Sequence, residues 1–284
     1  MNEGEQKAPA RMLPAGWPKD QPLAVSVSVM LEGWTDDSAP GIGPMGNPLR
    51  AGVLDTQARS WAAYGPKVGA WRLLDILAAQ GVGAVFYASG ILAERHPGLI
   101  EAIARAGHAV AAHGWAQNVV PAYQTAEEES LDLGRCVAAI ERGAGIRPVG
   151  WLSPRCTPSG RTSELLAGAG FEWHADFFDD DLPYRQVTKS GGITAIPFTM
   201  EVNDMPLYVR YGSEPEAFTR ILERIVSGWP RLGRMASCLD ITVHAHIFGR
   251  PMGALELMNS LDVVRRYADR AWLTDHRALA GLFR

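Results

Sequence analysis

The sequence predicts an α/β fold in which helices surround a largely parallel sheet. Over most of the 284 residues, short apolar runs alternate with segments of helical periodicity. Repeated strand–helix units of this kind favour parallel pairing of the strands. Because catalytic groups in such folds collect at the carboxyl ends of the strands, the residues that follow each strand are the first candidates for a functional site.

Each strand is predicted from a short apolar run, and each helix from apolar residues at helical spacing. The predicted strands cover residues 23–31, 83–89, 108–114, 149–154, 193–198 and 238–248. The predicted helices cover residues 68–81, 96–108, 125–145, 162–170, 214–229 and 254–268. Thr125 and Glu128 fit a capping box at the start of the third helix. Residues 1–20 are polar and contain Pro and Gly, so we expect an N-terminal arm and a single domain over 21–284.

The composition argues against nucleic-acid and membrane partners. The chain holds 27 Lys and Arg against 31 Asp and Glu, and it has no basic run. No apolar stretch reaches the length that spans a bilayer, and the N-terminus lacks the apolar core of a signal peptide. Three widely separated cysteines without a C-x-x-C pair fit a reducing compartment, so we expect a cytoplasmic protein.

Four polar residues, Glu32, His113, Arg155 and His244, lie at or just past the ends of predicted strands. Taken singly, each has an ordinary structural explanation, as a turn residue, a buried core histidine or an arginine in a salt bridge. Their joint placement at the catalytic end of the predicted sheet favours a functional role for Glu32, His113 and His244. For Arg155, a structural salt bridge stays the rival explanation.

Five segments around these residues carry a resemblance to a known family. They are VSVSVMLEGW, GHAVAAHGW, the block from Gly150 to Tyr184 that ends in DDDLPY, IPFTMEVNDM and VHAHIFGRP. In this order they resemble the NodB homology, or polysaccharide deacetylase, superfamily, and within it the allantoinase-like and cyclic-imidase-like branch. The likeness runs from about residue 17 to the end. It implies a distorted barrel of parallel strands, hydrolysis of a non-peptide C–N bond, and a homo-oligomer.

The chain departs from the family pattern at the metal site. The family's first motif holds two aspartates, a base and a metal ligand, where this chain has Leu31 and Glu32. Its second motif holds two histidines, where this chain has His113 and Gln117. Zinc-type sites use three protein ligands and an open position, and Glu32 with His113 would supply two. We therefore expect no tightly bound cofactor, and a divalent metal held by Glu32 and His113 is the alternative.

The resemblance also suggests a role for each matching residue. Ring opening of a cyclic imide or ureide expels a nitrogen whose charge is delocalised, so a base-activated water can suffice. We expect Glu32 to act as the base or to orient the water, His113 to position water or substrate, and His244 to protonate the leaving nitrogen. Arg155, which matches the arginine of the third motif, would orient Glu32 or steady negative charge.

Four further residues are candidate substrate contacts. They are Gln117, Trp115, His246 and Asp204, of which Gln117 would offer its amide to a ureide or imide edge. For Trp115, core packing is the alternative to stacking on a flat substrate. His246 lies two residues after His244 and would face the same side of a strand, so it could complete a metal site or contact the substrate.

The sequence therefore predicts a hydrolase of a small cyclic amide, imide or ureide. One alternative is a metal-dependent deacetylase of N-acetylated carbohydrate. The other is a catalytically inactive small-molecule binder on the same fold, because Leu31 stands where the family has its base.

Overall fold

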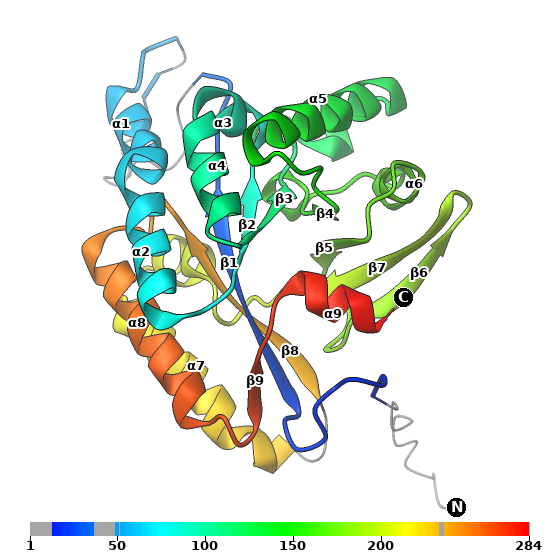
Figure 1. The fold of residues 1–284 in the computed structure, drawn as a ribbon. Coiled ribbons are helices and arrows are strands. Elements are labelled where there is room, and N and C mark those ends of the chain that lie inside the picture. Colours follow the sequence, from blue (N-terminus) through cyan, green and yellow to red (C-terminus); the bar gives the residue numbers. More distant parts are fainter. Residues whose placement is uncertain (1–12, 37–48, 51, 233–235, 284) are drawn as a thin grey trace, which may run out of the picture.

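The computed structural model describes residues 13–36, 49–50, 52–232 and 236–283. Within them, the centre of the fold is one curved sheet whose strands follow the order β6-β7-β5-β4-β3-β2-β1-β8, with β9 beside β1 (Figure 1). The strands are β1 (Leu23–Leu31), β2 (Val85–Ala88), β3 (Ala109–Ala112), β4 (Gly150–Trp151), β5 (Trp173–Phe177), β6 (Tyr184–Thr188), β7 (Gly191–Pro197), β8 (Ser237–His244) and β9 (Ala271–Leu273). Only the β6–β7 pairing is antiparallel, so the sheet is the distorted (β/α) barrel that the resemblance implied.

Helices cover the outside of this sheet (Figure 1). They are α1 (Thr56–Tyr64), α2 (Ala70–Gln80), α3 (Gly90–Arg95), α4 (Pro97–Arg105), α5 (Ala126–Ala144), α6 (Thr162–Gly168), α7 (Glu216–Gly228) and α8 (Pro251–Arg266). The last helix, α9 (His276–Leu282), packs on the inner face, where Ala280 shares a cluster with Met30. Shorter helical turns lie at η1 (Gly65–Gly69), η2 (Pro121–Tyr123), η3 (Pro154–Cys156), η4 (Met205–Arg210) and η5 (Trp229–Leu232). Among the described residues, no helix has both the length and the apolar character needed to cross a bilayer.

Alternation along β1 decides which side chains reach the barrel interior. Successive side chains of a strand point to opposite faces. The odd-numbered residues of β1 enter the outer core under the helices, among them Val29 and Leu31. The even-numbered residues point inward, among them Met30. Glu32 continues the inward set, whereas Leu31, at the position of the family's base, is completely buried under the helices.

Most of the predicted elements are confirmed, with boundaries that move by a few residues. β1 matches its prediction residue for residue, and the capping box of Thr125 and Glu128 forms at the start of α5. The strand predicted at 149–154 shrinks to two residues, and the one predicted at 238–248 ends at His244. The prediction missed β5, β6, β9, α1, α3 and α9, which are short or carry few apolar residues.

The early end of β8 corrects the expected geometry of His246. The chain turns directly after His244, whose carbonyl accepts hydrogen bonds from the N–H groups of Ile247 (2.9 Å) and Gly249 (3.3 Å). This turn packs so closely on the start of α2 that a Cβ on Gly69 would lie 1.9 Å from the carbonyl oxygen of Ala245. His246 therefore lies in a turn, not two residues further along the same strand face.

The helix α9 places the side chain of His276 inside the barrel, next to Ser26 of β1 and Tyr87 of β2. The Nδ1 atom of His276 lies 2.7 Å from the hydroxyl of Tyr87, and its Nε2 atom lies 3.0 Å from the hydroxyl of Ser26. Asp240 accepts a hydrogen bond from Ser26 at 2.5 Å, so this buried group is satisfied within the protein. Tyr87 also packs against His113, with ring centroids 6.4 Å apart, so this polar group lies close to the catalytic candidates.

Only part of the expected N-terminal arm falls within the described residues. Residues 1–12 lie outside them. Trp17 is buried and packs edge-on against Trp272, with ring centroids 5.7 Å apart. The segment around Trp17 is therefore attached to the domain and is not a loose arm.

Candidate active site

A cavity of about 280 Å³ opens at the carboxyl ends of the strands. Five of the residues predicted from the sequence line it, namely Glu32, His113, Arg155, His244 and His246. They arrive from the ends of β1, β3, β4 and β8, which are spread over the whole chain but adjacent in the barrel. The expectation that strand ends would gather these side chains is confirmed.

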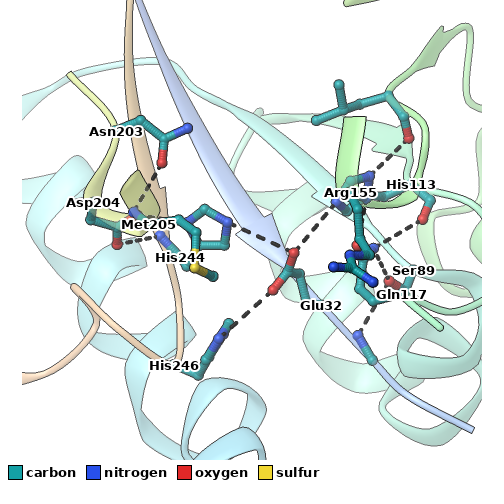
Figure 2. A network of polar contacts seen from close by, with 12 residues as sticks. Glu32, Ser89, His113, Gln117, Arg155, Asn203, Asp204, Met205, His244 and His246 are labelled. Carbon is teal, nitrogen blue, oxygen red and sulfur yellow. Dashed lines mark hydrogen bonds and ion pairs between the residues drawn. The ribbon is translucent and has the colours of Figure 1, made fainter. Parts of the chain in front are cut away.

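The carboxylate of Glu32 stands between three imidazoles (Figure 2). Its Oε1 atom lies 3.9 Å from Nε2 of His113 and 3.7 Å from Nε2 of His244. Its Oε2 atom lies 3.7 Å from Nε2 of His246. Each distance is slightly longer than a direct hydrogen bond, as is common in catalytic groups before substrate draws them together.

Hydrogen bonds on the far side of two imidazoles fix their orientation. Nδ1 of His113 lies 2.8 Å from the carbonyl oxygen of Leu152, so Nδ1 carries a proton and donates it. Nδ1 of His244 lies 2.6 Å from Oδ1 of Asp204 and donates to that carboxylate. In both residues the Nε2 atom is therefore the one presented to Glu32, an arrangement that holds catalytic imidazoles in one tautomer.

The surroundings push the three main titrating groups to different protonation states. Burial favours the neutral form of Glu32, but the charge of His244 and the neighbouring imidazoles of His113 and His246 outweigh it and lower the pKa of Glu32 to about 2. Burial opposes charge on His244, yet Asp204 and Glu32 raise the pKa of His244 above its usual value. Burial lowers the pKa of His246 to about 4, against the attraction of Glu32. At neutral pH, Glu32 is an anion and His246 is neutral, and the raised pKa of His244 favours its cationic form.

His246 is held by aromatic rings. The indoles of Trp34 and Trp61 meet the imidazole edge-on, with ring centroids 5.5 Å and 4.6 Å away. Its buried Nε2 atom has no hydrogen-bond partner among the described residues, and it faces Glu32. An unpaired nitrogen at this depth is costly unless a proton, water or substrate uses it.

Gln117 does not face the cavity, although the sequence suggested a substrate contact. Its Oε1 atom accepts a hydrogen bond from the backbone N–H of Arg155 at 3.1 Å. Its amide nitrogen donates to the hydroxyl of Ser89 at 3.2 Å and, more weakly, to the carbonyl oxygen of His113 at 3.4 Å. Its backbone N–H donates to Gly33 at 2.8 Å. With both ends of its amide occupied, Gln117 joins the loops that follow four strands (Figure 2).

Two other predicted substrate contacts also lie behind the cavity surface. Trp115 is buried in the outer core with the guanidinium of Arg135 stacked 3.4 Å above its ring, so core packing is the correct explanation. Asp204 is completely buried and accepts hydrogen bonds from the side chain and the backbone N–H of His244 and from the backbone of Phe248. It positions His244 and lies too deep to contact a substrate.

Arg155 sits on a strained turn at the cavity edge. Its φ is 56° and that of Cys156 is 49°, a left-handed conformation that costs non-glycine residues about 1–2 kcal/mol each. Among the described residues, no ion pair joins Arg155 to Glu32, whose neighbours are the imidazoles. Of the roles expected for Arg155, steadying negative charge agrees with this geometry, whereas orienting Glu32 does not.

The donor set does not reproduce a family-type metal site. Leu31 points into the outer core, and the amide of Gln117 is used by Ser89 and Arg155. The imidazoles of His113 and His246 approach different oxygens of Glu32 instead of sharing one point with it. Over the described part of the chain, no group of three or more His, Cys, Asp or Glu residues is arranged to hold a metal ion. We therefore derive no step through a metal.

The sequence did not reveal several residues that complete the cavity. Trp34, Trp61, Phe198, Met205 and Arg210 line it, together with the predicted residues. Trp34 follows Glu32 by two positions, so strand alternation alone could have placed it on the same side. Trp61 comes from α1, a helix that the sequence did not predict. The other three come from a loop and a helical turn, for which periodicity carries no signal of position.

The fold and this site together define a class of protein. At the carboxyl ends of a parallel barrel, a buried carboxylate lies beside imidazoles whose pKa values are shifted in opposite directions. Hydrolases that work by acid–base chemistry use groups of this kind.

Comparisons with known proteins agree with this class. The pattern of the family described as polysaccharide deacetylase matches residues 63–174. A Schizosaccharomyces pombe protein that carries the name polysaccharide deacetylase is 25% identical over 312 residues, which cover 92% of this chain and 93% of the relative. Residues 63–174 are therefore similar to the polysaccharide deacetylase family, and hydrolysis of a non-peptide carbon–nitrogen bond is consistent with these likenesses.

Solved structures repeat the fold over nearly the whole chain. A polysaccharide deacetylase-type protein of Pseudomonas aeruginosa PAO1 superimposes with a TM-score of 0.84 at 25% identity, covering 94% of this chain and 92% of that one. PuuE allantoinase superimposes with a TM-score of 0.85 at 24% identity, covering 96% of this chain and 94% of that one. At that identity, the likeness to the allantoinase shows a shared fold.

Proposed function

We propose that this protein hydrolyses a ring C–N bond of a small cyclic imide, ureide or related amide. The observation that supports this most is the cluster of Glu32, His113, His244 and His246 at the floor of a cavity of about 280 Å³. Pockets for drug-sized ligands measure roughly 300–1,000 Å³, so this one suits a small substrate. A small ring also agrees with the fold shared with an allantoinase.

We give each side chain a step that the geometry supports. The oxygen of a water molecule attacks the ring carbonyl carbon while Glu32, ionised at neutral pH, holds that water as a hydrogen-bond acceptor. A carboxylate with a pKa near 2 is a weak proton acceptor, so Glu32 orients the water. The Nε2 atom of the neutral His246 takes the proton that the water loses. The C–N bond then breaks, and its electron pair stays on nitrogen. His244, held by Asp204, protonates that nitrogen.

His113 completes the water site. Its Nδ1–H is committed to Leu152, so its Nε2 atom is free to accept a hydrogen bond from the attacking water or from a substrate N–H. The ring opens to a single product that carries a carboxylic acid and a free amide or ureide nitrogen, and this product keeps all atoms of the substrate and of the water.

A hydrolysis screen tests the proposal. The panel holds cyclic imides, allantoin, dihydropyrimidines and N-acetylated chito-oligomers, each with and without a strong chelator. We expect ring opening that survives the chelator. Activity on the acetylated sugars alone, lost with chelator, would establish the metal-dependent deacetylase that the family favours. Binding without turnover would establish the inactive binder.

Three expectations from the sequence accompany the proposal. A cytoplasmic location, a homo-oligomeric state and the absence of a nucleic-acid partner stay predictions. Sedimentation of the purified chain and fractionation of its host cells test the first two directly.

A further inference from the structure

Two arginines stand at the entrance of the cavity, on separate parts of the chain. Arg155 lies on the turn after β4, and Arg210 ends the helical turn η4 (Met205–Arg210). Both line the cavity, and both are exposed to solvent. Burial raises the pKa of the Cys156 thiol, and Arg210 is close enough for its positive charge to act against that rise. Arg210 therefore lies near the turn that carries Arg155.

Neither guanidinium is paired with any residue that the structure describes. In the part of the chain that the structure describes, neither takes part in a salt bridge or donates a side-chain hydrogen bond. They do not neutralise Glu32 either, because its carboxylate is surrounded by the imidazoles of His113, His244 and His246. The cavity entrance thus carries two positive charges, and none of the described residues supplies a counter-charge in contact with them.

The chain holds Arg155 at this place against a conformational cost. Both Arg155 and Cys156 adopt the left-handed conformation, and such strain persists only where the surroundings impose it. Gln117 holds the turn by accepting the N–H of Arg155. Gly114 allows Pro154 to pack against the neighbouring loop, since a Cβ at Gly114 would lie 2.3 Å from that proline. Strain of this kind is concentrated at ligand-binding positions.

The rest of the wall is mostly apolar. It consists largely of Met30, Leu152, Phe178, Phe198, Met200 and Met205. The single carboxamide in the lining, Asn203, already accepts a hydrogen bond from the backbone of Met205 at 3.0 Å. A sugar with many hydroxyl groups would lose hydrogen bonds against such a wall, whereas the faces of a small ring would not.

We propose that Arg155 and Arg210 form an anion subsite, and that the substrate is a cyclic amide or ureide bearing a carboxylate. This inference rests on the proposed function. The ring packs between the apolar walls with its carbonyl at Glu32, and the carboxylate lies at the entrance against the guanidiniums. Guanidinium groups match carboxylates with paired, charge-assisted hydrogen bonds, which fix the orientation of the ring as well as its affinity.

A matched pair of compounds tests this subsite. Hydantoin-5-acetic acid carries the carboxylate, and hydantoin-5-acetamide has the same shape without the charge. We expect the wild-type enzyme to prefer the acid in kcat/KM by about tenfold or more, as a charge-assisted contact predicts. Arg210→Gln should reduce that preference about tenfold or more. Arg220→Gln, which removes an exposed arginine on α7 (Glu216–Gly228) outside the cavity lining, is the control and should keep it.

Equilibrium binding separates this inference from the proposed function. Titration calorimetry of both compounds with wild type, Arg210→Gln and Arg155→Gln reports the subsite even if no ring is opened. If the wild type prefers the acid and this preference is smaller in both variants, the subsite is supported. Absence of ring opening would then count only against the proposed function. Equal binding of acid and amide, binding of neither, or a preference that Arg210→Gln leaves intact would overturn the subsite.

Discussion

The hydrogen bonds of Gln117 predict that this residue supports activity without touching the substrate. Gln117 is 2% exposed, and its side chain connects the loops of Ser89, His113 and Arg155. Gln117→Met keeps the length and volume of the side chain and removes both ends of the amide. Met fills irregular space well, so the loss of packing should be small.

The cost follows from the partners that are left. The hydroxyl of Ser89 still accepts a hydrogen bond from the backbone of Gly33 at 3.2 Å, so it is not orphaned. The N–H of Arg155 loses its acceptor, and an unsatisfied buried donor costs about 1–3 kcal/mol. We therefore expect the free energy of unfolding to fall by about 2 kcal/mol. For a chain of this size the melting temperature should fall by roughly 4–8 °C, at about 2–4 °C per kcal/mol.

The effect on turnover should exceed the effect on folding. Without Gln117, the strained turn relaxes and moves the guanidinium of Arg155 away from the cavity entrance. A misplacement of about 1 Å can reduce turnover about a hundredfold, so kcat/KM should fall by roughly that factor at a temperature where the variant stays folded.

The assay combines a thermal melt with kcat/KM on the ring substrate found in the hydrolysis screen. Gln124→Met is the matched control, because the buried Oε1 atom of Gln124 has no hydrogen-bond partner among the described residues. We expect the control to keep both the melting temperature and kcat/KM. A folded Gln117→Met variant with wild-type kcat/KM would refute the reasoning, since Arg155 would then hold its place unaided.

Three further predictions concern the Glu32 cluster. Glu32→Gln should lower kcat at least about a hundredfold with an unchanged circular dichroism spectrum. The control, Glu127→Gln on the exposed start of α5, should leave kcat unchanged. Full turnover in Glu32→Gln would remove Glu32 from the mechanism. Because Asp204 raises the pKa of His244, Asp204→Asn should move the alkaline limb of the kcat/KM profile to lower pH, and an unmoved limb would count against His244 as the acid. The pKa of His246 is lowered to about 4 in the fold, so the unfolded chain takes up its proton first as the pH falls below 6.5. Stability should therefore fall by about 3 kcal/mol between pH 6.5 and pH 4, and urea titrations of His246→Gln should lose that part of the slope.

Much of the barrel could be derived from the sequence, because its strands and helices have clear local signals. The Val-rich alternation of β1 (Leu23–Leu31) defines both its length and its two faces. The same alternation turns Leu31 outward and Glu32 inward. Since parallel strands carry their catalytic groups at one end, the meeting of Glu32, His113 and His244 also follows from local sequence and chain order.

Other parts of the site were decided by contacts between segments far apart in the chain. Gln117 looked like a failed metal ligand and proved to be a link between loops, because Ser89 and the backbone of Arg155 reach it only in the folded barrel. His246 reaches Glu32 from a turn that close packing against Gly69 produces, and no periodicity encodes that approach.

The protonation states likewise depend on tertiary structure. The sequence alone determined that the chain is a barrel-shaped α/β protein with Glu32, His113 and His244 at its catalytic end. Only the folded chain removes water from these groups, brings Asp204 to His244 and buries His246 next to Glu32. Burial and the distances between charges set each pKa, and both are properties of the packed structure that residue order does not carry.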